Sequence, residues 1–249
     1  MSLSRKKTKN NRSGSSFDTH SYDLPSKELY DRLAEMQPEI ERVCAEVPKK
    51  RLFSFIKRVF DIVFSVIALI LLSPLFLVIS IAVRRSGPGG AIFRQPRVGL
   101  RGKVFTMYKF RTMTENAESM LPDIVERNVG IGPMFKDPND PRLTPLGEML
   151  RRYSIDELPQ LVNILRGEMS FVGPRPPLVS EVVQYKPEET VRLSVIGGLT
   201  CSWQVHRKRE ADFYECLAYD KEYIEKRSLF LDLLLILQTF GVVSKGEGR

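Results

Sequence analysis

Histidine and cysteine are scarce in this chain of 249 residues, which holds 2 histidines and 3 cysteines. Cys44, Cys201 and Cys216 form no CxxC pair and no spacing typical of a metal site. An odd, scattered set of cysteines argues against a disulfide scaffold and indicates a reducing compartment. Of the two histidines, His20 and His206, the first lies in a polar tail, so catalysis by histidine has no good candidate.

A secretory signal is also missing, because residues 1–16 are polar and basic. Residues 1–25 are rich in Ser, Asn, Lys and Arg, a composition that predicts disorder. The chain carries 38 Lys and Arg against 30 Asp and Glu, a net charge of +8. Such a balance suits nucleic acid, anionic lipid or phosphorylated substrates. No nucleic-acid motif appears, and basic residues flank apolar runs as lipid anchors do, so we expect no nucleic acid.

Segment 26–47 has the period of an amphipathic helix, although Pro38 interrupts the pattern. We expect a short docking helix within a basic N-terminal extension that covers residues 1–50. The apolar residues that share one face of this helix are Leu29, Leu33, Met36, Ile40 and Val43.

Residues 62–83 form an uncharged apolar run, and one helix of about 20 such residues can cross a bilayer core. Ser73 and Pro74 lie in its middle, and an interior proline removes a backbone hydrogen bond and kinks a helix. Basic residues flank the run on both sides, so both ends prefer the cytoplasmic side of a membrane. A re-entrant hairpin satisfies both observations, with Ser73 bonding the carbonyl that the proline frees. The alternative is an ordinary kinked transmembrane helix.

From residue 87 onward the chain has the character of a soluble domain. Two extended stretches, 91–93 and 104–110, surround a turn and predict a β-hairpin. Lys109 and Arg111 would share one face of its second strand. Helical patterns follow at 112–127, 145–152 and 159–166.

Residues 228–243 are almost wholly apolar, but they are too short to span a bilayer comfortably and they contain Asp232. One interpretation is an interfacial helix that lies flat on a membrane, with Asp232 pointing away from the lipid. The other is a helix buried in the core. The side chains expected to face the lipid are Leu229, Leu233, Ile236, Leu237 and Phe240.

Two adjacent carboxylates, Asp156 and Glu157, stand among arginines and prolines. Ser154 and Glu157 match the capping box S-x-x-E, which keeps a purely structural interpretation open. Pro159 is favoured in the first turn of a helix and Gly167 would end it, so both carboxylates fall near its N-terminus. A helix N-terminus lowers the pKa of a carboxyl group, so Asp156 would stay ionised and available as a nucleophile. The core face of this helix is predicted to hold Leu158, Leu161, Val162 and Leu165.

Cations together with ionised carboxylates are what phosphoryl chemistry requires. Scattered basic residues are also common on solvated faces, so a catalytic pair and a solvated surface both stay open. The basic residues that would support a catalytic pair, if they converge on it, are Arg151 and Arg152 one turn earlier, with Lys109, Arg111, Arg142 and Arg175.

Four stretches carry a more specific signal: KRVFDIVFSVIALILLSPLFL at 57–77, KFRTM at 109–113, DPRLTPLGEMLRRYSIDELPQLVNILRGEMSFVGPRP at 140–176, and YIEKRSLFLDLLLILQTF at 223–240. On these residues the chain resembles the bacterial sugar transferase family, the monotopic polyprenyl-phosphate phosphoglycosyltransferases. The resemblance covers residues 51–249, and residues 1–50 lie outside it.

The resemblance implies transfer of a phospho-sugar from a UDP-sugar to a polyprenyl (undecaprenyl) phosphate, with release of UMP. This is the initiating membrane step of surface polysaccharide, exopolysaccharide or glycoconjugate biosynthesis. It makes Asp156 the nucleophile, which forms a phosphosugar–aspartyl intermediate, and Glu157 the second member of the pair. The implied cofactor is Mg²⁺, held with Asp156 as ligand and associated with the diphosphate.

The family pattern also implies roles for other positions. Ser73-Pro74 matches the break in a re-entrant membrane helix. One departure occurs at 198–210, where Arg207 and Lys208 replace a usual Gly and Arg. The residues implied to bind phosphate or nucleotide are Lys109, Arg111, Arg151, Arg152 and Arg175.

The expected fold class is α+β and mainly helical, with a re-entrant helix-break-helix over 51–86 and a catalytic domain over 87–249 that carries a β-hairpin and interfacial helices. The implied location is the bacterial inner membrane, with the catalytic domain on its cytoplasmic face and membrane lipid as a partner. A catalytically inactive, membrane-tethered scaffold of the same pathway is the alternative. The identity of the sugar stays open, as does the oligomeric state, for which a homodimer is one option.

Overall fold

The computed structural model describes residues 25–115, 117, 120, 132–133, 140–206 and 212–246. Residues 1–24, with His20, and the family departure at Arg207 and Lys208 lie outside this part. The helix predicted over 112–127 does not begin where expected. Residues 112–115 are not helical, because Met113 forms a β-bridge with Leu143, and most of the remaining segment lies outside the described residues.

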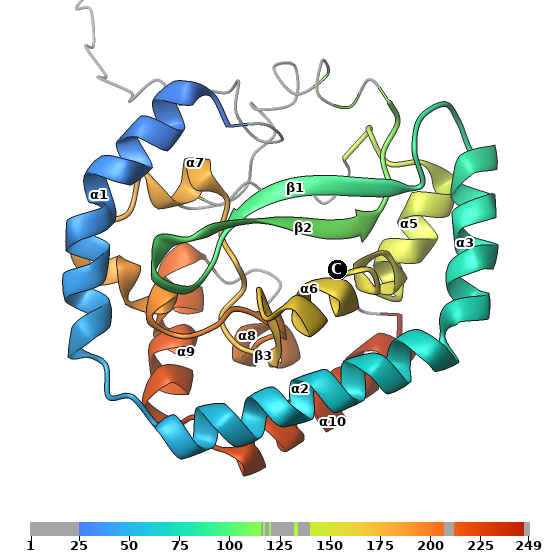
Figure 1. Cartoon of the computed structure of the whole chain (residues 1–249). Coiled ribbons are helices and arrows are strands. Elements are labelled where there is room, and N and C mark those ends of the chain that lie inside the picture. The colour runs from blue at the N-terminus through green and yellow to red at the C-terminus, as the bar shows by residue number, and fades with distance from the viewer. Residues whose placement is uncertain are drawn as a thin grey trace, which may run out of the picture.

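The chain is mainly helical with little sheet, as the α+β prediction requires (Figure 1). An antiparallel hairpin pairs β1 (Ile92–Val98) with β2 (Val104–Phe110), so its first strand is longer than predicted. A short parallel pair joins β3 (Ser170–Val172) to β4 (Gly198–Thr200). Within the described residues, the helices of four or more residues are α1 (Lys27–Glu46), α2 (Arg51–Leu71), α3 (Ser73–Arg85), α5 (Pro145–Arg152), α6 (Gln160–Arg166), α7 (Val179–Val182), η5 (Pro187–Ser194), α8 (Ser202–Val205), α9 (Phe213–Lys226) and α10 (Leu229–Ser244).

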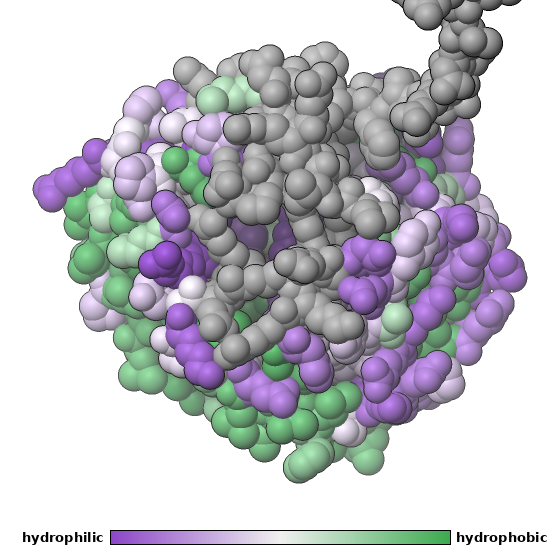
Figure 2. Space-filling model, turned by 180° about the vertical axis from the view of Figure 1, so that it is seen from behind, coloured by the Kyte–Doolittle hydropathy of each residue, from purple (hydrophilic) through white to green (hydrophobic). Residues whose placement is uncertain are grey.

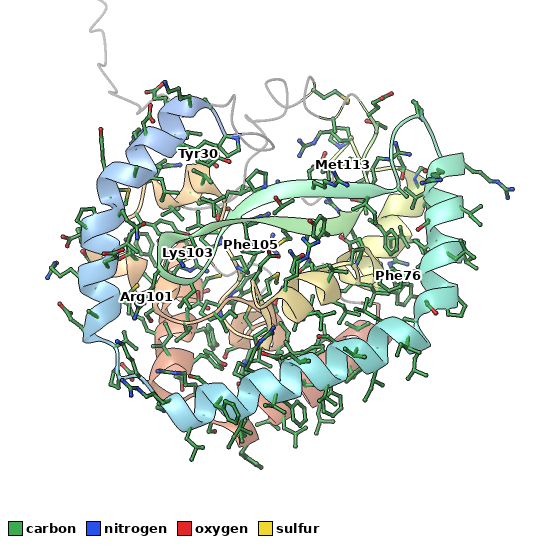
Figure 3. All side chains as sticks on the ribbon, viewed as in Figure 1. Tyr30, Phe76, Arg101, Lys103, Phe105 and Met113 are labelled. Carbon is green, nitrogen blue, oxygen red and sulfur yellow. The ribbon has the colours of Figure 1, made fainter. Side chains whose placement is uncertain are left out.

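Helix α1 is part of the core. It runs through Pro38 without ending, so the predicted interruption is wrong. Gln37 donates from Nε2 to the carbonyl of Arg101, which ties the helix to the hairpin turn near Arg101 and Lys103 (Figure 3). Its buried residues pack into one apolar cluster with Val98, Val179, Val182, Leu193, Phe213 and Leu217.

Helices α2 and α3 meet at an angle of 63° around Leu72. Pro74 has no N–H for the carbonyl of Ile70, four residues earlier, and the Ser73 hydroxyl donates to that carbonyl at 2.8 Å, as predicted. Phe76 points inward from α3, with its ring centroid 5.5 Å from that of Phe110 (Figure 3). Among the described helices, none is long and apolar enough by itself to cross a membrane, and α2 with α3 meets that criterion only as a bent pair.

Helix α2 turns its polar side chains inward. Lys57, Asp61 and Ser65 are buried at four-residue intervals, while the apolar residues between them are exposed. Asp61 accepts from the Ser170 hydroxyl at 3.0 Å and from the backbone N–H of Phe171 at 3.2 Å. Hydrophobic surface gathers along the lower and left edges of Figure 2, where α2, α10 and α3 lie. This distribution is the reverse of an ordinary surface helix.

Helix α10 is held to α2 through Asp232, which accepts from Lys57 Nζ at 2.5 Å and from the Tyr223 hydroxyl at 2.8 Å. Asp232 therefore points inward, away from the exposed face. Of the side chains predicted to face outward, Leu229, Leu233, Leu237 and Phe240 are exposed. Ile236 is not, because it packs with the cluster of Val172, Val205, Tyr223 and Leu235. One face of α10 thus belongs to the core and the other is apolar and exposed.

Candidate active site

The paired carboxylates lie in a single 3-10 turn, Ile155–Glu157, between α5 and α6. Ser154 adopts a left-handed conformation with φ of 51° and makes no side-chain cap, so the capping box that the sequence left open as an alternative does not form. The turn is closed instead by the backbone N–H of Glu157, which donates to the Ser154 carbonyl at 3.2 Å. Helix α6 follows with Pro159 as its N-cap, and Gly167 ends it at φ 82°, as predicted.

Asn163 fixes α6 against the hairpin. Its Oδ1 accepts from the backbone N–H of Tyr108 at 3.1 Å, and its Nδ2 donates to the Thr106 carbonyl at 2.7 Å. This side-chain bridge occupies the buried face of α6 beside Leu161 and Ile164. Leu165, predicted to face the core, is 36% exposed. The bridge holds the carboxylate turn over β2.

Lys109 reaches Glu157 from β2, with Nζ 2.7 Å from Oε1. Both side chains are largely buried, at 17% and 18% exposure. The charges of Lys109 and Arg175 lower the pKa of Glu157 even though burial alone would raise it. Burial lowers the pKa of Lys109, and the charge of Glu157 opposes that shift. Lys109 therefore meets the condition set by the sequence, since its charge converges on the carboxylate pair.

Asp156 has a different environment. It is 5% exposed, and within the described part of the chain it forms no ion pair. Burial raises the pKa of Asp156, with Lys109 opposing the shift and the neighbouring Glu157 adding to it. The expected lowering by a helix N-terminus is wrong in direction, because desolvation outweighs any dipole at this short turn.

A small cavity of about 10 Å³ lies beside the pair, roughly the space of one water molecule. Arg175 lines this cavity and belongs to the segment that follows β3. The start of that segment, at Gly173, packs closely against Gly198 of β4. A Cβ on Gly198 would lie 2.1 Å from the backbone nitrogen of Gly173, so only glycine permits this approach. The cavity is lined by Met107, Lys109, Glu157, Gln160, Arg175, Pro176, Gly198, Leu199 and Gln204.

The other predicted cations do not all converge. Arg151 is near enough to oppose the raised pKa of Asp156, and its Nε donates to Thr112 Oγ1 at 3.0 Å. Arg152 lies on the exposed side of α5. Arg142 pairs with Asp140 at 2.7 Å.

Arg111 does not line the cavity, and its implied role in binding phosphate stays a prediction. It follows the last residue of β2, and its guanidinium donates to the carbonyls of Val83 and Gly87 at 2.9 Å and to that of Pro88. Arg111 therefore holds the turn after α3 and does not face the carboxylates.

Sequence reasoning missed Arg97 and Asn163. Arg97 lies on β1, 5% exposed, with Nη1 donating to the Pro176 carbonyl at 3.0 Å. The predicted strand ended at Phe93, so the strand alternation that places Arg97 on the inner face was not predicted. Asn163 was assigned to a helix, but its partners on β2 come from tertiary packing.

Among the described residues, no group of three or more His, Cys, Asp or Glu side chains could hold a metal by itself. Mg²⁺ is commonly bound by one or two carboxylates together with substrate phosphates. Asp156, buried and without a cation partner in the described residues, fits such an incomplete site, with Glu157 adjacent to it.

Proteins of several bacteria are similar to this chain over most of its length. The chain is 42% identical over 193 residues to a galactosyl transferase, CpsE, of Streptococcus agalactiae serotype III (strain NEM316), which covers 77% of this chain and 43% of that protein. It is 38% identical over 196 residues to the exopolysaccharide production protein ExoY of Rhizobium meliloti (strain 1021), covering 77% and 87%. It is 36% identical over 227 residues to the UDP-glucose:undecaprenyl-phosphate glucose-1-phosphate transferase of Escherichia coli (strain K12), covering 87% and 47%.

The chain spans less than half the length of two of these three relatives. The family model described as bacterial sugar transferase matches residues 52–246, which include α2 through α10 and both carboxylates. This chain belongs to the bacterial sugar transferase family.

Proposed function

We propose that the protein transfers a sugar phosphate from a UDP-sugar to a polyprenyl phosphate, and that Asp156 is the nucleophile. The relatives named for undecaprenyl-phosphate transfer support the reaction class. The observation that carries the proposal is the contrast within the pair. Glu157 is neutralised by Lys109, whereas Asp156 is buried beside it with no ion-pair partner among the described residues.

In the first step an Asp156 carboxylate oxygen attacks the sugar-linked phosphorus. The bond from that phosphorus to the bridging oxygen breaks, and UMP leaves with the bonding electrons. Since the second pKa of a phosphate is about 6, this leaving group needs no strong general acid. A buried anionic nucleophile is poorly solvated and therefore reactive, and Lys109 and Arg175 offset the repulsion between it and the diphosphate.

In the second step an oxygen of the polyprenyl phosphate attacks the same phosphorus. The acyl phosphate bond breaks, Asp156 is regenerated as a carboxylate, and the product is a polyprenyl-diphosphate-sugar. Dividing the transfer in this way lets one substrate arrive from water and the other from lipid.

We propose Mg²⁺ as the cofactor, with Asp156 as its protein ligand and Glu157 next to it. A divalent cation bound there supplies positive charge that screens the nucleophile from the diphosphate. Lys109 keeps Glu157 ionised, since the lowered pKa of Glu157 arises from that neighbour and Arg175.

The proposal includes a monotopic attachment to the bacterial inner membrane, with the catalytic part on the cytoplasmic face. The bent pair α2–α3 would enter one leaflet and return, because a spanning helix would place one basic flank on the far side. The exposed apolar face of α10 would lie at the same interface.

The reaction is tested with detergent-solubilised protein, undecaprenyl phosphate, Mg²⁺ and a panel of UDP-sugars, with UMP release as the measurement. Asp156→Asn should abolish UMP release and the phosphosugar adduct seen by intact mass spectrometry, while Asp31→Asn, at an exposed site on α1, should change neither. Near-normal turnover by the Asn variant, after deamidation is excluded, would disprove the nucleophile. A folded wild type that releases no UMP from any sugar would favour the scaffold.

The topology is tested by cysteine labelling of intact cells at one engineered site before α2 and one after α3. Both sites should be protected from an impermeant reagent. Labelling of one site from outside would contradict the hairpin and favour a spanning helix. Pro74→Leu combined with Ser73→Ala removes both features of the break and should shift the labelling toward that spanning pattern.

A further inference from the structure

Arg97 is a buried cation without a carboxylate partner. Its Nε and Nη2 donate to Gln95 Oε1 at 3.0 and 2.6 Å, and its Nη1 donates to the Pro176 carbonyl at 3.0 Å. Within the described ranges, no Asp or Glu lies at ion-pair distance from it. Burying a cation without an ion-pair partner is unfavourable, so an anion from outside the chain would stabilise Arg97.

A second arginine provides an internal comparison. Arg192 donates from Nη2 to the Arg175 carbonyl at 3.4 Å, so two buried arginines bond successive carbonyls of one segment. Arg192 is also paired with Asp220 at 2.7 Å, and both side chains are almost fully buried. Arg192 is thus ion-paired inside the protein, whereas Arg97 is not, and Glu181 and Glu157 act on Arg97 only through charge beyond ion-pair distance.

The unmatched charge adjoins the active-site cavity. Pro176, which Arg97 holds, lines the cavity together with Lys109, Glu157 and Arg175. Burial and the charge of Arg175 lower the pKa of Arg97 to about 10, with Glu181 and Glu157 opposing the shift, so Arg97 is protonated at neutral pH. Lys109, Arg175 and Arg97 therefore act together on Glu157, and each lowers its pKa.

We infer that Arg97 is a positioning residue for the diphosphate of the donor. It holds the Pro176 carbonyl so that Arg175 faces the cavity, and its positive charge, which has no ion-pair partner, favours a diphosphate over a monophosphate. The inference rests on the proposed function, because the UDP-sugar supplies the anion. The charge of a buried arginine such as Arg97 discriminates most strongly between a diphosphate and a monophosphate where water is excluded.

The test measures binding of UDP and of UMP to the purified full chain by titration calorimetry. Arg97→Met should weaken UDP binding roughly 10- to 100-fold and UMP binding much less. Arg97→Lys, which keeps the charge, should recover most of the UDP affinity. Arg94→Met, at an exposed position on the same strand, is the matched control and should bind both nucleotides as the wild type does.

Steady-state kinetics give a second readout, in which Arg97→Lys should raise the KM for the UDP-sugar more than it lowers kcat. Equal losses for UDP and UMP without recovery by lysine would mean that Arg97 only supports the fold, and unchanged UDP binding by Arg97→Met would also overturn the inference. If Arg97→Met does not fold, Arg97→Gln, which keeps a donor for the Pro176 carbonyl but loses the charge, takes its place in the UDP and UMP titrations. A wild type that neither binds UDP nor releases UMP would refute the proposed function itself and the inference with it.

Discussion

Lys109 Nζ lies 2.7 Å from Glu157 Oε1, although 48 positions separate the two residues in the chain. This bond joins the β-hairpin to the turn between α5 and α6. It neutralises Glu157, whereas the neighbouring Asp156 has no ion-pair partner among the described residues. Stability measurements should therefore respond in opposite directions to loss of the two carboxylates.

Asp156→Asn should make the protein more stable at neutral pH. The pKa of Asp156 is raised in the fold, so its ionised form costs stability once the pH rises above the unfolded value, near 3.8. The gain, measured by thermal unfolding of the variant beside the wild type, should be present at pH 7 and should vanish below about pH 3.8. A variant less stable at pH 7 would show that the Asp156 charge is matched.

Glu157→Gln should have the opposite effect. The pKa of Glu157 is lowered from 4.5, so its charge contributes stability above that pH and loses the contribution as the pH falls through the folded value. The substitution leaves Lys109 buried without its partner and should cost about 3 kcal/mol at pH 7. Urea unfolding at pH 7 and at pH 3 gives the comparison, and an equal cost at both values would contradict the assignment.

Asp232→Ala should destabilise the protein by about 3–5 kcal/mol, because Lys57 would remain buried without its counter-charge. The double variant Lys57→Met with Asp232→Leu removes both charges and should recover most of that loss. Chemical unfolding in one detergent checks both variants. A double variant as unstable as Asp232→Ala would mean that the packing of Asp232 against Tyr223 matters more than the ion pair.

The exposed face of α10 can be separated from its core face. Leu233 and Leu237 are 49% and 59% exposed, so Asp at both positions should leave thermal unfolding in detergent nearly unchanged. Each apolar side chain buried in lipid contributes about 1.5–3 kcal/mol, so flotation with liposomes should fall strongly. Leu235→Asp, at a residue 1% exposed, should instead unfold the protein. If the outer pair also unfolds it, α10 is a core helix on both faces.

Gly147 lets α5 pack closely against the backbone of Thr112, just after the end of β2. A Cβ there would lie 1.9 Å from the backbone carbonyl oxygen of Thr112, so Gly147→Ala should cost about 1–3 kcal/mol. It should also reduce turnover, because α5 carries Arg151 against Thr112. Gly241→Ala, with open space around its Cβ in α10, should be neutral or stabilising by about 0.5–1 kcal/mol. Equal effects of the two variants would contradict the close packing.

The elements with strong local signals could be predicted from the sequence. The helices over 145–152 and 159–166, the hairpin and the break at Ser73-Pro74 depend on proline, glycine and apolar periodicity, and the structure contains them. Pro38 does not interrupt its helix as the sequence predicts, because packing of α1 against its apolar cluster outweighs one lost hydrogen bond.

The site was less predictable, since its geometry depends on contacts between distant segments. Lys109 reaches the carboxylates, yet Arg111, two residues later, lies past the strand end and bonds carbonyls around Gly87. The pKa of Asp156 is raised because the side chain is buried, and burial cannot be predicted from the local position of Asp156 near a helix N-terminus. The inward orientation of Arg97 could be predicted only from the full length and register of β1, which the sequence did not indicate.

The family match begins at residue 52, but the folding unit does not. Helix α1 lies entirely before that boundary and covers Val182, Leu193 and Phe213. Arg227 donates to the Pro48 carbonyl, and Lys50 donates to the carbonyls of Glu225 and Arg227, so the link after α1 is clasped to the end of α9. A protease cut in that link would leave α1 in place, whereas trimming the chain to residues 52–246 would expose the apolar residues that α1 covers and favour aggregation.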